Sequence, residues 1–558
     1  MRGHARKAAF ASVAALALAL SACGGDDDGD DDGDGGEPAA TGGSFSIYIG
    51  EPENPLIPGN TSETEGGQVC DSLWTGLVKY DPETNQAEFN GVAESVESDD
   101  QTNWTITLND GWTFHDGTPV TAEDYVNTWN WVAYSPNAND NSYFFANIVG
   151  YDDLQAETDA EGNPLGEPAA TEMSGLEVVD ETTFTVELTG PFAQFPITLG
   201  YTAFFPLPQA FFDQGADPVA FGAQPIGNGP FMAEEPFVPG EGITLTKYED
   251  YAGEDPANAD EVEYRVYTEQ NTAFTDVQAG NLDIVDQIPP DAIGSAPDEF
   301  GDRFVTNPRG DITSLGFPDY LERYRDPRVR HAFSMGIDRQ AIIDAVFLGS
   351  RTAATSFVSP VVDGYREDAC GEFCEYDPDA ANALLDEAGF DRSVPVELWF
   401  NAGAGHEEWM QALGNSLRDS LGIEYVLKGD LQFAEYLPLR EEKGLTGPYR
   451  HAWIMDYPSM QNFLEPLFAE SALAPAGSND VFYVNPEFDE LIAEGNSADN
   501  DEEAIEAYQA AEDILVEDMP AAPLWYGVIQ GVHSENIDNV TIDAFGRIDA
   551  AAVEVVNP

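Results

Sequence analysis

Residues 104–131, WTITLNDGWTFHDGTPVTAEDYVNTWNW, place the tightest constraint on the fold of this chain. Apolar and polar residues alternate over the first five positions, which is the two-residue period of a half-buried strand. Turn-forming residues at 109–111 predict a turn into a second short strand, 112–114. Thr121 and Asp124 have the spacing of a capping box, and one apolar stripe marks the helix that follows: Tyr125, Val126, Trp129 and Val132. The stretch therefore predicts a strand, a hairpin and a capped helix.

Residues 114–124 carry the sequence FHDGTPVTAED, and five of these eleven residues are polar without a packing role that would require them. The run is identical, letter for letter, to the signature of the bacterial extracellular solute-binding proteins of family 5. In that family, which contains the oligopeptide- and dipeptide-binding proteins of ABC importers, a strand, a turn, this run and a helix recur in the same order. Further segments that resemble family motifs span nearly the whole mature chain: 76–86, 92–100, 225–231, 326–339, 377–389 and 520–528.

The resemblance implies a two-lobed α/β fold of the periplasmic-binding-protein type, large and of type II, with an extra inserted subdomain. A chain of 558 residues is too long for a single core, and the strand, helix, strand order between 394 and 427 independently favours an α/β lobe. We expect the ligand to bind in the cleft between the lobes, with hinge closure around it. The expected segments are a signal peptide 1–22, an acidic tether 23–43, lobe I formed by 44–75 with 190–309 and 519–558, an inserted subdomain 76–189 and lobe II 310–518.

The first 23 residues have the pattern of an export signal. A basic start precedes thirteen mostly apolar residues, 8–20, which is shorter than the roughly 20 residues that a membrane-spanning helix needs. Leu20-Ser21-Ala22-Cys23 resembles a bacterial lipobox, whose cysteine is acylated and becomes the first mature residue. The alternative is a plain secretory signal with an incidental cysteine. The lipobox predicts a protein anchored by lipid at Cys23 to the outer face of the cytoplasmic membrane, in an extracellular or periplasmic space.

Acidic residues dominate the composition, with 103 Asp and Glu against 22 Lys and Arg and a formal net charge of −81. Such a surface repels nucleic acid and anionic lipid, so neither is expected as a partner. One hypothesis is adaptation to high salt, where counterions screen self-repulsion; the alternative is an ordinary acidic exported protein. An unfolding midpoint that stays constant between roughly 0.1 and 2 M salt would contradict the first hypothesis. The Asp/Gly run 26–43 resembles half of an EF-hand loop, but Ala39 stands where glutamate is needed, so we interpret it as a solvated tether.

Three cysteines remain besides Cys23. Cys370 and Cys374 are predicted to form a local disulfide, because an exported protein meets oxidising conditions. A zinc site is the alternative, but it would need further ligands, and no other Cys or His is near in sequence. Cys70 is expected to be buried as a small apolar residue.

Motifs for catalysis are incomplete. The run 406–410, HEEWM, lacks the second histidine of a zinc-protease motif, no GxSxG sequence occurs, and six histidines give little general-base capacity. The glycine-rich run 225–231 has no Lys-Ser/Thr after it, so it predicts a tight turn rather than a phosphate-binding loop. We therefore expect no enzyme activity, no metal and no cofactor.

The candidate ligand site is the segment YRHAWIMDYP at 449–458, which resembles a motif of the peptide-binding family members. There a Trp-x-x-Asp segment lies in the cleft and its aspartate pairs with the α-ammonium of the bound peptide; Trp453 and Asp456 occupy those positions. A desolvated ammonium must be paired, and a carboxylate does this at short range. The alternative is a strand-ending turn that Asp456 caps. Three further residues join the predicted site: Tyr457, Arg450 as the partner of a ligand carboxylate, and Phe433, a cleft aromatic where the family often has tryptophan.

The sequence therefore predicts a substrate-binding lipoprotein that captures short peptides and presents them to an ABC permease driven by ATPase subunits. Backbone pairing in a strand-like mode would give tolerance of many side chains. We expect a monomer. Two alternatives stay open: the same fold with another solute, such as an oligosaccharide, a nickel chelate or an opine, and a sensory or chaperone-like surface lipoprotein without transport. The basic run 326–339 is either a helix with internal ion pairs or a contact with the permease.

Overall fold

A computed structural model gives the arrangement of residues 42–61, 63–81, 87–88, 90–157, 164–402, 405–474 and 477–556. The predicted signal peptide, Cys23 and nearly all of the predicted tether lie outside these described residues. The elements below belong to one unit, residues 40–558. In the described ranges, no helix combines the length and the apolar character needed to cross a membrane.

The largest sheet has twelve strands: β1 (Ser44–Ile49), β8 (Phe231–Met232), β9 (Gly242–Lys247), β10 (Glu261–Val266), β11 (Ile284–Val285), β12 (Phe304–Pro308), β13 (Asp311–Gly316), β14 (Arg351–Ala353), β15 (Val396–Trp399), β16 (Tyr425–Lys428), β17 (Tyr449–Ile454) and β18 (Ala521–His533). The main path runs in the order β16-β15-β17-β13-β18-β11-β1-β10-β9-β8, with β12 and β14 paired to β18. The parallel pairs β1–β10 and β15–β16 need crossover connections, which segments with helices supply.

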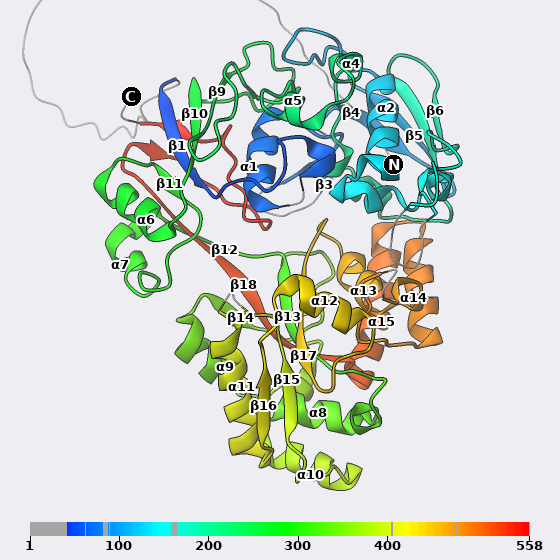
Figure 1. Cartoon of the computed structure of the whole chain (residues 1–558), viewed down its shortest axis with the longest axis vertical. Coiled ribbons are helices and arrows are strands. Elements are labelled where there is room, and N and C mark those ends of the chain that lie inside the picture. Colours follow the sequence, from blue (N-terminus) through cyan, green and yellow to red (C-terminus); the bar gives the residue numbers. More distant parts are fainter. Residues whose placement is uncertain are drawn as a thin grey trace, which may run out of the picture. The chain divides into compact units, whose positions relative to one another are not determined.

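One strand, β18, is shared by both halves of this sheet. Its residues 521–527 pair with β13 and β14, whereas residues 528–533 pair with β11 and β12. Figure 1 shows β18 in red, passing from the side of β11 and β12 to the side of β13 and β17. A single continuous strand therefore connects the two halves.

Separate hydrophobic clusters fill the two halves, as expected for two lobes. One cluster extends over residues 312–545 and packs the β13–β17 side of the sheet against helices. The other half holds three clusters, which centre on β1 and β10, on the 104–131 stretch and on α6 (Gln270–Ala279). The predicted two-lobed α/β fold is confirmed. The longer helices of the first cluster are α8 (Pro327–Met335), α10 (Pro378–Ala388), α11 (His406–Leu421), α12 (Phe433–Glu441), α13 (Met460–Phe468), α14 (Pro486–Asn496) and α15 (Asp501–Asp518).

The 104–131 stretch forms the predicted strand and capped helix. The three apolar side chains of β5 (Asn103–Leu108) are buried. At the start of α2 (Ala122–Ala133), the Asp124 carboxylate accepts hydrogen bonds from the Thr121 amide at 2.9 Å and from its hydroxyl at 2.7 Å. A four-stranded sheet of order β4-β5-β7-β6 packs here, with β4 Ala93–Glu97, β6 Leu176–Val178 and β7 Thr183–Glu187.

The second short strand predicted at 112–114 is wrong. Only a single bridge forms there, between Thr113 and Pro119. The chain reverses at once, because the Phe114 amide donates to the Thr118 carbonyl oxygen over 2.8 Å around the Asp-Gly turn. Too few residues are left on either side of that turn to build a strand pair.

The glycine-rich run 225–231 has a different role from the predicted tight turn. Neither Gly227 nor Gly229 has a positive φ. Both instead lie against the end of α1 (Thr64–Leu73), where a Cβ on Gly227 would overlap the Leu73 carbonyl oxygen. The run also meets the 104–131 stretch, since the His115 amide donates to the Gly227 carbonyl oxygen over 2.8 Å. The glycines permit a close approach of backbones.

The remaining structural predictions concern cysteines and the basic run. A disulfide joins Cys370 and Cys374, in line with their spacing, and Cys70 is fully buried. Arg330 and Arg339 of the basic run are buried, and their guanidinium groups donate to main-chain carbonyl oxygens that include those of Asp518 and Pro523. These bonds favour an internal structural role for the basic run over a permease contact.

Candidate functional site

One edge of β17 is left largely unpaired. β13 pairs with all six residues of β17, whereas β15 meets it only at Trp399 and Tyr449. Among the described residues, no strand pairs with the other side of residues 450–454. Peptide N–H and C=O groups on such an edge can bond to an added strand, so β17 offers a place for an extended ligand.

Two predicted site residues, Trp453 and Asp456, are held by one side chain, that of Asn462 on the first turn of α13. The Asn462 Oδ1 accepts hydrogen bonds from the Asp456 amide at 2.8 Å and from Trp453 Nε1 at 3.2 Å. Its Nδ2 donates to Asp456 Oδ2 at 3.1 Å. Because Asn462 is only 1 % exposed, it fixes both side chains from the lobe interior.

The Asp456 carboxylate lacks a positive partner. No Lys, Arg or His of the described part of the chain lies within 4 Å of it, and its other oxygen accepts a hydrogen bond from the Tyr143 hydroxyl at 3.4 Å. Burial raises the pKa of Asp456 to about 6, against the opposing effect of the bonds from Asn462 and Tyr143. A half-buried carboxylate without a counter-ion raises the free energy of the folded protein, and a ligand cation would lower it again. Asp456 is therefore a candidate ligand-binding group.

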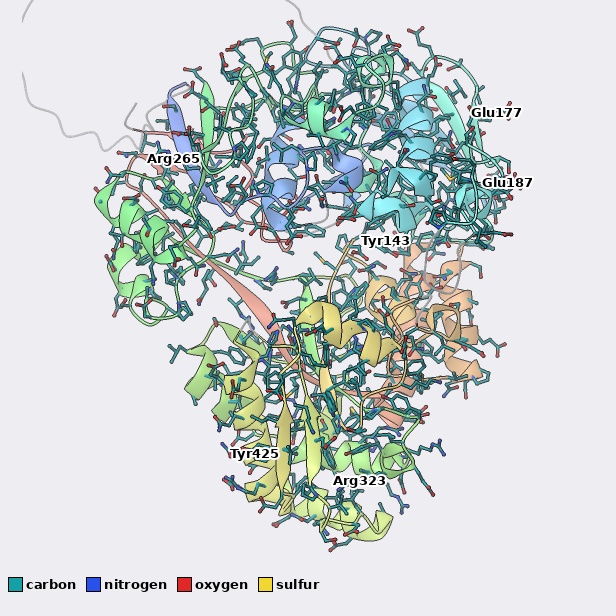
Figure 2. All side chains as sticks on the ribbon, viewed as in Figure 1. Tyr143, Glu177, Glu187, Arg265, Arg323 and Tyr425 are labelled. Atoms are coloured by element: carbon teal, nitrogen blue, oxygen red, sulfur yellow. A yellow bond between two sulfur atoms is a disulfide. The ribbon has the colours of Figure 1, made fainter. Side chains whose placement is uncertain are left out.

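Several tyrosines lie close enough to this carboxylate to be affected by its charge. Burial raises the pKa of four tyrosines, and the charge of Asp456 raises it further: Tyr80, Tyr143, Tyr201 and Tyr457. Tyr143 is 55 % exposed, and Figure 2 labels it at the edge of the N-terminal elements that faces the region of α12 and α13. Aromatic faces attract cations, so the exposed Tyr143 ring beside this carboxylate would favour an ammonium group there.

The other predicted side chains near β17 are Arg450 and Phe433. Arg450 is half-buried, and burial lowers the pKa of its guanidinium without a compensating carboxylate among the described residues. A buried guanidinium without an anion is suited to take one from a ligand. Phe433 starts α12 and is 49 % exposed. Trp453 and Asp456 are thus linked through Asn462, and Arg450 lies on the same strand as Trp453. Phe433 is exposed at the first residue of α12.

Tyr457 belongs to a contact between the lobes. Its ring is buried in the cluster that the 104–131 stretch forms, and its hydroxyl donates to Gln461 Oε1. The same turn makes a second contact, since Ser459 Oγ donates to Gln194 Oε1 at 2.8 Å. The segment that carries Asp456 therefore lies where the two lobes touch. That Tyr457 also contacts ligand stays a prediction.

A cavity of about 570 Å³ lies beside β18. Asp286 Oδ1 in its wall is buried without a hydrogen-bond partner in the described part of the chain, and burial raises the pKa of Asp286 to about 7. None of the five predicted ligand residues lines this cavity. Residues from both lobes line it, among them Gln287, Ile288, Arg309, Phe347, Arg351 and Gln530.

Sequence reasoning missed Asn462 and Tyr143. Asn462 is six residues beyond Asp456, at a spacing that no local motif marks as a contact. Tyr143 is 313 residues from Asp456 in the chain, so only the folded structure brings them together. The one sequence feature that could have pointed to Asn462 is the short helix that begins a few residues after Asp456.

Comparison with known proteins identifies the family and the fold. The family described as "Bacterial extracellular solute-binding proteins, family 5 Middle" matches residues 89–474. The Oligopeptide-binding protein OppA of Bacillus subtilis (strain 168) is 25 % identical over 518 residues, which cover 90 % of this chain and 91 % of that protein. The Periplasmic murein peptide-binding protein MppA of Escherichia coli (strain K12) is 26 % identical over 464 residues, with 82 % and 83 % covered.

A solved structure shows the same fold. The unliganded open form of MppA, a periplasmic murein tripeptide-binding protein, superposes with a TM-score of 0.79 at 23 % identity, over 93 % of this chain and 98 % of that chain. The family match spans more than half of the chain and includes both β5 and β17. The chain therefore belongs to the bacterial extracellular solute-binding proteins of family 5.

Proposed function

We propose that this protein captures short peptides with a free amino terminus and delivers them to an ABC importer. The observation that carries the proposal is the Asp456 carboxylate, which is half-buried, fixed by Asn462 and without a counter-ion in the described chain. A peptide ammonium would supply the missing charge. The relatives named as oligopeptide-binding and murein peptide-binding proteins support the same class of ligand.

The unpaired edge of β17 explains how such a site can accept many sequences. A peptide laid along residues 450–454 would bond through its own backbone, independently of its side chains. Arg450, on the same strand, would then neutralise the carboxylate of a short ligand. Ile454 is 52 % exposed at the end of β17, so it offers apolar contact area to the ligand.

The proposal includes the setting of the protein. Acylation at Cys23 would hold it at the outer face of the cytoplasmic membrane, and the acidic run 23–43 would act as the tether. Lobe I, with residues 44–75, 190–309 and 519–558 and the inserted 76–189, would close on lobe II, 310–518. A permease and ATPase subunits would be the partners, and catalysis is no part of this role.

Isothermal titration with a tripeptide and its N-acetylated form tests the ligand. The free peptide should bind the wild-type protein, and Asp456→Asn should weaken that binding by about 2–5 kcal/mol, because it leaves a buried ammonium unpaired. The acetylated peptide should bind both proteins equally weakly. Asp419→Asn, an exposed aspartate on α11, is the matched control and should leave the affinity unchanged.

Two results would contradict the proposal. Equal binding of free and acetylated peptide would remove Asp456 from an ammonium site. Tight binding of an oligosaccharide, a nickel chelate or an opine without peptide binding would assign the cleft to another solute. Native mass spectrometry of the protein as purified would show directly which class of solute it carries.

A further inference from the structure

The cavity of about 570 Å³ beside β18 is lined by a carboxylate and a guanidinium that the proposed peptide site does not use. Asp286 Oδ1 and Arg309 Nε are both buried, and neither atom has a hydrogen-bond partner in the described part of the chain. Among the described residues, neither side chain takes part in an ion pair within 4 Å. Two groups of opposite charge therefore line one cavity without being paired.

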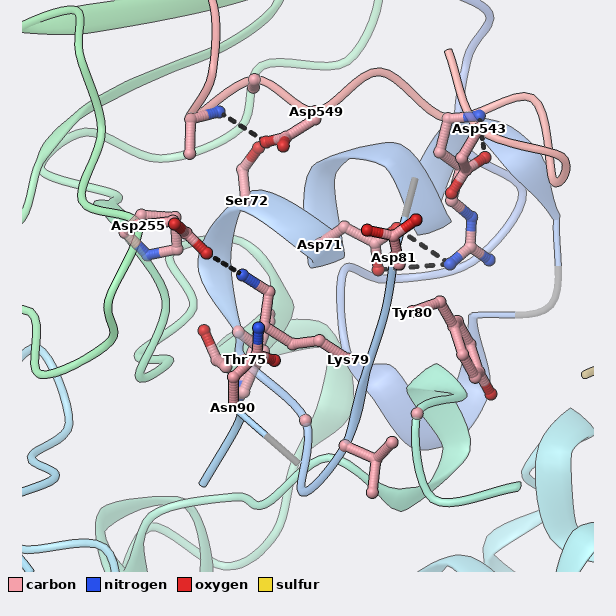
Figure 3. A pocket seen from close by; sticks show the side chains of 18 of the residues that line it. Asp71, Ser72, Thr75, Lys79, Tyr80, Asp81, Asn90, Asp255, Asp543 and Asp549 are labelled. Atoms are coloured by element: carbon pink, nitrogen blue, oxygen red, sulfur yellow. Dashed lines mark hydrogen bonds and ion pairs between the residues drawn. The ribbon is translucent and has the colours of Figure 1, made fainter. Parts of the chain in front are cut away.

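The cavity near Arg547, of about 470 Å³, differs in this respect, and Figure 3 shows its lining. Both of its cations are paired, since Lys79 Nζ lies 2.9 Å from Asp255 and Arg547 Nη1 lies 2.9 Å from Asp71 (Figure 3). Its lining residues are confined to 71–255 and 541–551, whereas the cavity beside β18 has lining residues from both lobes. The unpaired charges therefore occur in the cavity whose shape depends on how the lobes are placed.

Asp286 and Arg309 are attached to opposite ends of β18. Asp286 directly follows β11, which pairs with residues 532–533. The Arg309 amide donates to the Gly527 carbonyl oxygen over 3.1 Å, and the Arg309 carbonyl oxygen accepts a hydrogen bond from Ser359 Oγ at 2.9 Å. A movement of one lobe relative to the other would therefore change the distance between the two charged groups.

The charges around the cavity favour a shorter distance between these two groups. Burial raises the pKa of Asp286 and the charge of Arg309 lowers it, so each group already lies in the electric field of the other. The charge of Glu65 also raises this pKa, which places a second carboxylate near Asp286. Asp311, a carboxylate near Arg309, accepts a hydrogen bond from the Gly527 amide. Asp311 is thus already engaged, whereas Asp286 Oδ1 can still accept a hydrogen bond from Arg309.

We propose that Asp286 and Arg309 form an ion pair when the lobes close, and that this pair stabilises the closed form. The inference rests on the proposed function, because the binding of a peptide is the event that closes the lobes. A pair that forms as water leaves a cavity is favourable only while both partners are present, since one partner alone would be left buried and unpaired. The loss of one partner would therefore weaken peptide binding without removing a contact with the peptide.

A double-mutant cycle on peptide affinity tests the pair. Asp286→Asn, Arg309→Gln and their combination are titrated with trialanine at about pH 7.5, where Asp286 and Asp456 are largely ionised. Each single variant should bind about tenfold more weakly than the wild-type protein, whereas the double variant should bind more tightly than either single variant. Arg351→Gln, which removes another cation of the same cavity, is the matched control, and its effect should multiply with that of Asp286→Asn.

Two further measurements exclude other roles for the same side chains. Arg309→Gln should weaken the binding of trialanine and of its C-terminal amide by the same factor, because Arg309 pairs with Asp286 and not with the ligand carboxylate. Urea unfolding of the unliganded proteins should show no coupling between the two variants, because the pair is not formed before closure.

The possible failures are distinguishable. Effects of Asp286→Asn and Arg309→Gln that simply multiply in the double variant would overturn the pair while peptide binding stands. An Arg309→Gln effect that disappears with the amidated peptide would assign Arg309 to the ligand carboxylate, and coupling in the unliganded protein would make the pair a permanent one; either result overturns the proposal. If trialanine does not bind the wild-type protein, the proposed function itself fails.

Discussion

The hydroxyl of Tyr143 donates a hydrogen bond to the Asp456 carboxylate at 3.4 Å, although the two residues belong to different lobes. The bond is one of two that lower the pKa of Asp456 against the effect of burial. The Asp456 carboxylate therefore contacts residues of both lobes, Tyr143 and Asn462. A ligand ammonium that bonds to this carboxylate would lie at the same junction.

Tyr143→Phe should raise the pKa of Asp456 above about 6 and weaken the binding of a free-amine peptide by about 1 kcal/mol, because one hydrogen bond to the carboxylate is lost. The ring stack on Phe144 is retained in this variant. Titration near pH 6 is the measurement, and Tyr376→Phe, which alters an exposed ring elsewhere, is the control. An affinity equal to wild type would show that the Tyr143 bond is not used in the bound state.

The affinity for free-amine peptides should rise between about pH 5 and pH 7. A peptide amino group has a pKa near 8 and stays charged over this range, whereas Asp456 ionises only above about 6, so affinity should fall up to tenfold per pH unit below that value. Titration at about pH 5, 6 and 7 checks this. Asp456→Asn should abolish the dependence; an identical pH profile in that variant would assign the titration to another group.

Asp456 also affects the stability of the unliganded protein, which should fall with rising pH whereas the peptide affinity should rise. The folded-state pKa of Asp456 is raised above its ordinary 3.8, so its contribution to stability is present below about pH 4 and is lost as the pH rises through about 6. In the unliganded protein, the ionised side chain therefore costs free energy at neutral pH. A bound ammonium would recover that cost, which links affinity to stability at this residue.

Asn462→Ala should weaken peptide binding by about 1–3 kcal/mol, because Trp453 Nε1 and the Asp456 amide lose their acceptor and the carboxylate loses a donor. Binding should fall more than stability if Asn462 acts mainly by positioning Asp456. Titration and urea unfolding, compared in the same variant, separate the two effects. A lower unfolding midpoint with an unchanged peptide affinity would make Asn462 a packing residue only.

Local rules predicted the elements that are set by neighbouring residues. The capping box at Thr121 and the alternation of β5 each depend on contacts within a few positions. The strand expected at 112–114 failed because a tight turn leaves no room for pairing, which residue preference alone does not show. Local patterns therefore predicted the strand and the capped helix of the 104–131 stretch, but not where strand pairing ends.

The candidate site could be proposed from the sequence only where a family motif marked it. Asp456, Trp453 and Arg450 were placed on one segment by resemblance, and the structure puts them on or directly after β17. Tyr143 and the cavity beside β18 depend on chain crossings that no short pattern contains. Long-range contacts of this kind arise from topology, which periodicity and capping do not encode.

Gly227→Ala should destabilise the fold by about 1–3 kcal/mol, because the added methyl group would overlap the Leu73 carbonyl oxygen and force α1 and the 225–231 run apart. Urea unfolding measures the change. Gly190→Ala is the matched control, since open space surrounds that position and its φ is not positive. Equal midpoints for the two variants would show that the approach at Gly227 has room to relax.

Replacement of Cys370 and Cys374 by serine should lower the free energy of unfolding by about 2 kcal/mol, the value expected for a disulfide that closes a loop of five residues. The loop packs on the lobe, since the ring of Phe373 stacks on His331 at 3.7 Å between centroids. Urea unfolding of the wild-type protein with and without reductant checks the same bond. An unfolding curve that reductant leaves unchanged would contradict a stabilising role.

The division of β18 at residues 527 and 528 has a mechanical consequence. Each end of the strand is bound into the ladder of one lobe, so a change of angle between the lobes would be absorbed by backbone torsions at the boundary between residues 527 and 528, without rupture of either ladder. The free-energy change of such a rotation would then depend on the contacts that the bound ligand makes with both lobes, rather than on any loss of main-chain hydrogen bonds.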